Sequence, residues 1–227
     1  MPLSIVIPCL NEAAGMAAML AALEPLRQRG AELIVVDGGS SDDTLARARA
    51  ADHVIVAPRG RSLQMNAGAA RASGTVLLFL HADCRLPPEV DALIMDGLRR
   101  SGRRWGRFDV RIETTSPLLR LVALLMNVRS RWTGIATGDQ ALFITRTLFD
   151  AVGGFPPIVL MEDVEMSRRL KRYGRPLCLK HRVTVSARRW LKHGVLRTIL
   201  LMWRLRLAYW LGADPRKLAL RYANHEP

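Results

Sequence analysis

The sequence predicts an α/β fold around a mostly parallel sheet, and three features of its first hundred residues support this prediction. Short segments rich in Val, Ile and Leu recur at residues 3–9, 31–37, 52–58 and 75–83. Segments with Ala, Leu and charged residues at helical spacing separate them, at residues 12–29, 41–51 and 62–73. The apolar segments show too little alternation for a sheet with one wet face. We therefore expect four buried parallel strands separated by helices.

The pattern is looser after Gly102. We expect an edge or antiparallel strand at 104–113, an apolar helix at 117–131 and a short strand at 139–145. Residues 161–174 begin with acids, end with bases and close on a glycine, which is typical of a helix. A long helix is expected at 187–211. Because no repeat or linker interrupts the chain, we expect one domain over residues 1–186, with 187–227 as its C-terminal helical extension.

The charge balance favours an anionic partner. The 227 residues include 34 Lys and Arg against 20 Asp and Glu, a net charge of +14. Phosphorylated ligands and anionic membranes both suit this balance. The arginine pairs are spread over the whole chain rather than gathered in a basic tail, so nucleic acid is not an expected partner.

Cysteine usage and hydropathy point to a cytoplasmic protein. Cys9, Cys84 and Cys178 are far apart and form no CxxC pair, which argues against a disulfide framework or a zinc ribbon. The N-terminal segment lacks the features of a signal peptide. Arginines interrupt both apolar segments that approach membrane-spanning length. We expect a soluble protein, with peripheral membrane contact as the alternative.

Polar side chains follow three of the four predicted strands. Glu12 follows the first strand, Asp37 ends the second, and His81 and Asp83 follow the fourth. Ligands of open parallel sheets bind beyond the carboxyl ends of the strands, where these side chains would meet. A single carboxylate such as Asp83 is more often simply solvated, but Mg²⁺ or Mn²⁺ commonly takes one or two carboxylates together with substrate phosphates. The sequence has neither GxGxxG nor a P-loop motif, so dinucleotide and P-loop sites are not supported.

Five segments in this order carry a family resemblance. They are SIVIPCLNEA (4–13), LIVVDGGSSDDT (33–44), LLFLHADC (77–84), TGDQALFITR (137–146) and GGFPPIVLMEDVEMSRRLKRYG (153–174). Together they resemble glycosyltransferase family 2, whose members have the A-type fold, a Rossmann-like nucleotide-sugar-binding domain. The overall pattern is most similar to a bacterial subgroup labelled as arsenosugar-biosynthesis or selenium-associated glycosyltransferases.

The resemblance implies a donor site at the strand ends. Pro8, Glu12 and Asp37 match contacts to the nucleotide, and Asp83 matches the acid that reaches a divalent cation, Mg²⁺ or Mn²⁺, on the diphosphate. His81 stands where the family usually has an acid, which leaves one negative charge fewer. Arg61 is a further candidate for a phosphate or base contact, although a basic loop is more often simply solvated.

The resemblance also implies residues for catalysis and for the acceptor. Asp163 matches the base that takes a proton from the acceptor, with Glu162 beside it. The plainer interpretation is that both acids only stabilise the helix dipole. Further candidates for sugar or acceptor contacts are Asp139, Gln140, Arg189 and Trp190. The last two belong to a QxxRW-like segment in which Ser186 replaces the glutamine.

The function expected from these features is inverting transfer of a sugar from a nucleoside diphosphate, UDP above all, to a small-molecule acceptor. Two alternatives stay open. One is a peripheral-membrane transferase that loads sugar onto a polyprenyl phosphate, and the other is a non-catalytic protein that binds nucleotides or anions.

The sequence does not decide what the apolar side of the C-terminal helix contacts. Leu196, Leu200, Trp203, Leu207 and Trp210 share one side of it. Such a stripe can dock on the domain, join two copies of the chain as a homodimer, or lie in a membrane interface.

Overall fold

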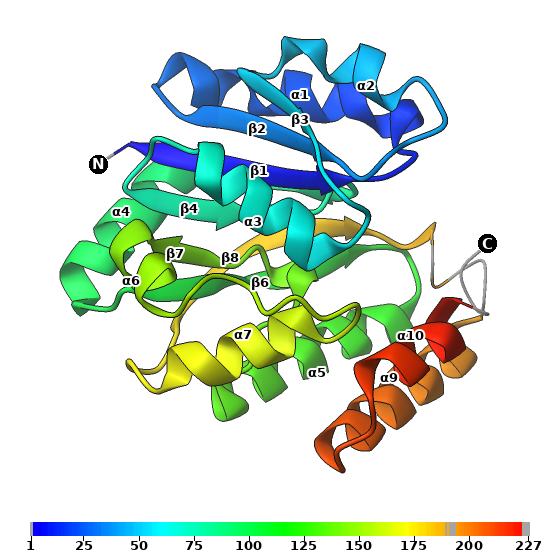
Figure 1. Cartoon of the computed structure of the whole chain (residues 1–227). Helices are drawn as coiled ribbons and strands as arrows, with labels where there is room; N and C mark the ends of the chain where they lie inside the picture. The colour runs from blue at the N-terminus through cyan, green and yellow to red at the C-terminus, as the bar shows by residue number, and fades with distance from the viewer. Residues whose placement is uncertain (1, 189, 191–193, 224–227) are drawn as a thin grey trace.

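The computed structural model describes residues 2–188, 190 and 194–223, and its centre is an eight-stranded sheet (Figure 1). The strand order is β3-β2-β1-β4-β7-β6-β8-β5. The strands are β1 (Leu3–Cys9), β2 (Glu32–Asp37), β3 (His53–Val56), β4 (Val76–Phe79), β5 (Cys84–Arg85), β6 (Trp105–Glu113), β7 (Phe143–Thr145) and β8 (Leu177–Ser186).

The first four strands are parallel, as predicted. β1 lies between β2 and β4, with Ile5 opposite Leu33 on one side and Leu78 on the other. Every residue of β1 and β4 is buried. The expected burial of residues 52–58 is wrong, because β3 is an edge strand that exposes 39% of Val54 and 64% of Val56.

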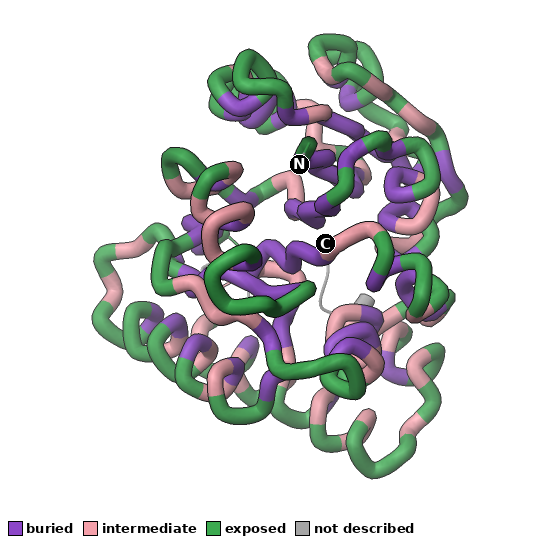
Figure 2. The backbone as a smooth tube through the Cα atoms, turned by 90° about the vertical axis from the view of Figure 1, so that its left-hand side faces the viewer, coloured by how far each residue is buried: buried purple, intermediate pink, exposed green. Residues whose placement is uncertain are grey.

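Helices cover both faces of the sheet (Figure 1). Ile5 and Ile7 point to the face packed by α1, α4 and α5, and Val6 points to the face packed by α3, α6 and α7. The described helices are α1 (Ala13–Gln28), α2 (Thr44–Arg47), α3 (Arg61–Arg71), α4 (Val90–Ser101), α5 (Pro117–Thr133), α6 (Arg146–Ala151), α7 (Glu162–Lys171), α9 (Val195–Trp210) and α10 (Pro215–Ala223), with 3-10 turns η1 (Ala48–Ala50) and η2 (Gly138–Gln140). Figure 2 shows the same layering as buried strands between partly exposed helices.

Two predicted helices are shorter than expected. Residues 41–51 form only α2 and the 3-10 turn η1. The predicted helix at 187–211 is interrupted at Gly194, which has a non-helical conformation (φ 81°, ψ 134°). α9 begins at the next residue, Val195. Residues 191–193 lie outside the described part of the chain.

The second half of the sheet brings an antiparallel strand beside β4. β7 runs antiparallel to β4 and to β6, with Phe143 opposite Leu78. The predicted strand at 139–145 is therefore only three residues long, and η2 precedes it. β6 is antiparallel to β7 as predicted, but it lies inside the sheet because β8 covers its other side. This arrangement places η2 at the carboxyl end of β4.

The C-terminal helices pack on the start of α7. Leu205 of α9 and Leu218 of α10 form a small buried cluster with Met161. α9 thus docks on the rest of the protein, but through the face opposite the predicted stripe, which stays exposed. Within the described residues, none of the helices has both the length and the hydropathy required to cross a bilayer.

Candidate active site

The carboxyl ends of β1, β2 and β4 meet η2 and the start of α7. His81 follows β4, and its Nδ1 lies 3.5 Å from Oδ1 of Asp139 in η2. A Cβ on Gly138 would lie 2.1 Å from Cε1 of the His81 ring, so only glycine leaves room for the imidazole here. The predicted rim therefore exists, and it depends on Gly138 as well as on the side chains.

Asp163 lies at the start of α7, and two backbone N–H groups fix its side chain. The amide of Gly138 donates to its Oδ2 at 2.9 Å, and the amide of Val164 donates to its Oδ1 at 2.7 Å. Met161 precedes the helix in the left-handed region with φ of 68°. Asp163 therefore links η2 to α7, close to the His81–Asp139 pair.

Glu162 is a buried acid next to Asp163, with only 5% of its surface exposed. The pKa of its carboxyl is raised to about 7, mainly by burial and also by the charge of Asp163, while Arg61 and His81 act in the opposite direction. Arg61 is the first residue of α3. The charge of this predicted phosphate contact lowers the pKa of Glu162.

A set of possible metal ligands lies at the same rim. One atom each from His81, Cys84 and Asp139 can be chosen so that all three lie within 4.8 Å of one another. Asp83 is exposed beside them, and the Cys84 thiol lies 3.6 Å from its Oδ1. Burial raises the pKa of the Cys84 thiol well above its ordinary value, so this group stays protonated and is a poor ligand. The His81 nitrogen and the carboxylate oxygens of Asp83 and Asp139 are donors that Mg²⁺ or Mn²⁺ can take together with substrate phosphates. The residues therefore fit a divalent cation.

The predicted nucleotide contacts lie along β1 and β2. Pro8 is buried within β1, opposite Val36. Asp37 is fully buried, and its Oδ2 accepts from the amides of Gly39 and Ser40 at 2.9 and 2.8 Å. Asp37 thus shapes its own loop in this structure, and its contact with a ribose stays a prediction.

Glu12 is influenced by two charged groups of the rim, Arg188 and Asp83. Its Oε2 is 3.6 Å from Nη2 of Arg188. Burial raises the pKa of Glu12, Arg188 lowers it, and the nearby Asp83 raises it again. Glu12 and Asp83, predicted from separate motifs, therefore face the same space.

Gln64 was missed by sequence reasoning. It is 4% exposed, and its Nε2 donates to the carbonyls of Cys9 and Val36 at 2.8 Å each. It holds together the ends of β1 and β2, where the chain turns into the loops of the rim. A glutamine in the apolar face of a helix is the signal that could have identified it.

The predicted acceptor residues fall in different places. Asp139 is at the rim, whereas Gln140 is fully buried and donates from Nε2 to Asn127 at 3.4 Å. Trp190 is half-buried and packs against the main core cluster. Arg189 lies outside the described residues.

Arg129 of α5 is a second residue that the sequence did not reveal. Its Nε and Nη2 atoms are buried and have no hydrogen-bond partner among the described residues. Its pKa is lowered to about 10, mainly by burial and also by Arg206 of α9, while Asp163 acts in the opposite direction. Nε and Nη2 form the edge of the guanidinium that binds carboxylate or phosphate in bidentate fashion. α5 also contains Arg120 and Arg131, so no signal in the sequence singled out Arg129.

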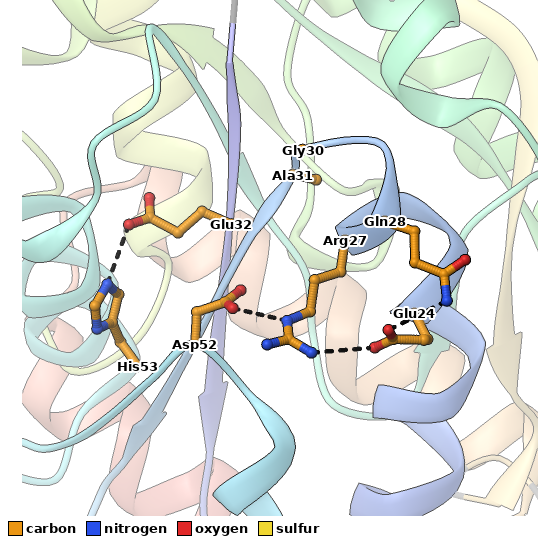
Figure 3. A pocket seen from close by; sticks show the side chains of 8 residues that line it. All are labelled: Glu24, Arg27, Gln28, Gly30, Ala31, Glu32, Asp52 and His53. Carbon is orange, nitrogen blue, oxygen red and sulfur yellow. Dashed lines mark hydrogen bonds and ion pairs between the residues drawn. The ribbon is translucent and has the colours of Figure 1, made fainter.

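A shallow pocket elsewhere does not belong to this site (Figure 3). It lies at the amino ends of β2 and β3, the opposite edge of the sheet from the rim. Figure 3 shows its charged groups paired with each other, Arg27 with Asp52 at 2.7 Å and His53 with Glu32 at 3.2 Å. These pairs close the pocket without leaving a group aimed at a ligand.

Comparison with known proteins agrees with the motifs. The model of the family "Glycosyl transferase family 2" matches residues 4–156, about two thirds of the chain. The chain belongs to glycosyl transferase family 2. A curated relative, the PGL/p-HBAD biosynthesis glycosyltransferase of Mycobacterium tuberculosis H37Rv, is 32% identical over 171 residues, 67% of this chain. The chain spans 62% of the length of that family member.

Solved structures of low sequence identity share the fold. The Staphylococcus aureus TarS fragment 1–349 in complex with UDP superposes with a TM-score of 0.65 at 17% identity, covering 82% of this chain and 60% of that one. Glucosyl-3-phosphoglycerate synthase from M. tuberculosis, solved with Mn²⁺, UDP and its product, has a TM-score of 0.59 at 21% identity, covering 81% and 70%. These similarities confirm the predicted A-type fold.

Proposed function

We propose that this family 2 protein transfers a sugar, with inversion, from a UDP-sugar to an acceptor nucleophile. The observation that carries the proposal is the position of Asp163, which is hydrogen-bonded to the same loop that contacts His81. A donor held at the strand ends and a base at the start of α7 would therefore lie on two sides of one space. The UDP in the two related structures supports the choice of nucleotide.

Asp163 acts as the base. Inversion requires a carboxylate on the face of the sugar opposite the leaving nucleoside diphosphate, where it removes the acceptor proton as the new bond forms. The two N–H groups that hold Asp163 fix its orientation. Glu162 is buried behind it and tunes the local charge rather than touching the acceptor.

The residues of the rim would hold a divalent cation, Mg²⁺ or Mn²⁺. When bound, it supplies positive charge against the diphosphate as that group leaves. Asp83 and His81 would hold it, with Asp139 within reach. Glu12 and Arg61 flank the same space and would position the nucleotide and its phosphates.

The acceptor carries a phosphate or carboxylate. The observation that favours an anionic acceptor is the edge of Arg129, which has no hydrogen-bond partner in the described part of the chain. Arg206 lies nearby, and Asp163 is the neighbouring acid. A free phosphorylated metabolite and a polyprenyl phosphate share this chemistry, so the lipid-linked alternative stays in place. The resemblance to arsenosugar or selenium-associated enzymes does not indicate any further ligand for this site.

The test uses the donor alone, since water is a slow substitute for the acceptor. The protein should release UDP from one member of a UDP-sugar panel with Mn²⁺ present. Asp163→Asn should lower this release by about a hundredfold, within the usual range for general-base catalysis. Its affinity for UDP should be unchanged. Asp150→Asn, which alters an exposed acid of α6, is the control. Full activity of Asp163→Asn would remove the base assignment.

A further inference from the structure

The structure assigns a lipid-docking surface to the exposed apolar faces of α9 and α5, and we propose that its partner is an anionic bilayer. This inference goes beyond the transfer reaction and does not depend on it. Both helices lie at the end of the molecule opposite α1 and α2 (Figure 1).

The outer face of α9 is apolar and uncovered. Leu196, Leu200, Trp203, Leu207 and Trp210 are 57% to 80% exposed. At 100° per residue they fall within an arc of about 80° on the side of the helix opposite Leu205. The inner face already packs on Met161, so the outer face is not needed to hold the helix in place.

The charges of α9 favour a membrane. Arg204 and Arg197 lie about 40° to 60° beyond one edge of the apolar arc, and Arg206 lies about 40° beyond the other. α9 contains no Asp or Glu within its bounds. A helix that lies in the plane of an anionic membrane interface typically has this composition, with leucine and tryptophan on one face and arginine on both sides of that face.

α5 repeats the pattern. Its exposed apolar residues are Leu118, Leu121, Leu124, Leu125, Val128 and Trp132, and it also contains no Asp or Glu within its bounds. Two helices with exposed apolar faces at one end of the chain's fold exceed the scattered single apolar residues of ordinary surfaces.

The same charges disfavour self-association through α9. Two copies of this face would bring the arginines of both helices together, with no acid on either helix to pair with them. Lipid phosphates supply the negative charge that a second copy does not. Docking would also place the bilayer one helix away from Met161 and hence from Glu162 and Asp163.

Co-sedimentation with vesicles tests the proposal. The full chain should bind phosphatidylcholine vesicles that contain phosphatidylglycerol at least about tenfold more strongly than phosphatidylcholine alone, and salt should weaken the binding. Trp203→Ser with Leu207→Ser should lower the partition coefficient by about tenfold or more, because it removes apolar contact area. The melting temperature should stay unchanged, since neither residue packs in the core. The matched control is Val54→Ser with Val56→Ser, which alters exposed apolar residues on the β3 edge.

Three outcomes would overturn the proposal. They are absence of binding to phosphatidylglycerol vesicles, equal binding by the Trp203→Ser, Leu207→Ser variant, and a stable dimer in light scattering that this variant dissociates. The last outcome would assign the face to a second copy of the chain. Wild-type binding by the β3 variant, with loss in the α9 variant, would support the bilayer.

Discussion

At the scale of single residues, Glu162 links the site to the stability of the fold. Its pKa of about 7 lies above the ordinary value of 4.5 because the side chain is buried beside Asp163. Between these two pH values the folded protein binds more protons than the unfolded chain, so the free energy of unfolding falls as pH rises through this window. The size of the effect is at most about 3 kcal/mol.

Glu162→Gln should flatten this dependence. The variant keeps a neutral group of similar shape, so its free energy of unfolding should change less between pH 4.5 and pH 7 than that of the wild type. Urea unfolding at several pH values measures the difference. Identical slopes in the two proteins would mean that Glu162 titrates normally.

Gly138 is the residue on which the position of His81 depends. Gly138→Ala would drive a methyl group into the imidazole, where the Cβ would lie 2.1 Å from Cε1. We expect a loss of about 1–3 kcal/mol in the free energy of unfolding and a weaker affinity for Mn²⁺. Isothermal titration with Mn²⁺ checks the second effect.

Gly15→Ala in α1 is the matched control for that substitution. A Cβ there meets no atom within 4 Å, so this variant should be more stable by up to about 1 kcal/mol and should bind Mn²⁺ normally. Normal affinity for Mn²⁺ in Gly138→Ala would show that His81 does not contribute to the cation site.

At the scale of elements, α5 joins the sheet to the site. Asn127 donates to the carbonyl of Val110 at 3.0 Å and accepts from its amide at 2.8 Å, which fixes α5 against β6. Two positions further along, Arg129 is held near Asp163, and no described residue hydrogen-bonds to its Nε or Nη2. A buried cation that the fold leaves unpaired is a cost in stability that binding of an anion would offset.

Arg129→Met should therefore be at least as stable as the wild type, yet lose its response to anions. Burial and Arg206 already disfavour the charged side chain. Inorganic phosphate should raise the melting temperature of the wild type and of the control Arg120→Met, an exposed arginine of the same helix, but not that of Arg129→Met. An equal phosphate response in all three proteins would contradict the anionic acceptor site.

At the scale of the whole molecule, apolar runs were enough to predict the first half of the fold. Strands β1, β2 and β4 are buried on both faces, and such strands appear in the sequence as continuous runs of Val, Ile and Leu. β8 was missed because exposed Lys180, His181 and Arg182 interrupt its middle. β7, with three residues, is too short for any periodicity to appear.

The sequence predicted the site residues that lie at strand termini. It was less informative about residues whose orientation depends on packing between elements. Glu12, His81, Asp83 and Asp163 follow strands or open a helix, so topology alone brings them to one rim. The inward direction of Gln140 and the isolation of Arg129 depend on α5, whose position no motif specifies. The apolar stripe of α9 is visible in the sequence. The face of α9 that docks is not, because it depends on the position of Met161 in the fold.

The most direct test of the proposed function is the melting temperature of the full chain with UDP, in the presence and absence of Mn²⁺. At about 100 times its dissociation constant, UDP should add roughly 2.7 kcal/mol, a rise of about 5 to 10 °C for a chain of this size. We predict a rise that is larger with Mn²⁺, and that loses its dependence on Mn²⁺ in Asp83→Asn. No rise with UDP or any UDP-sugar, with Mn²⁺ or Mg²⁺ present, would contradict donor binding at this rim.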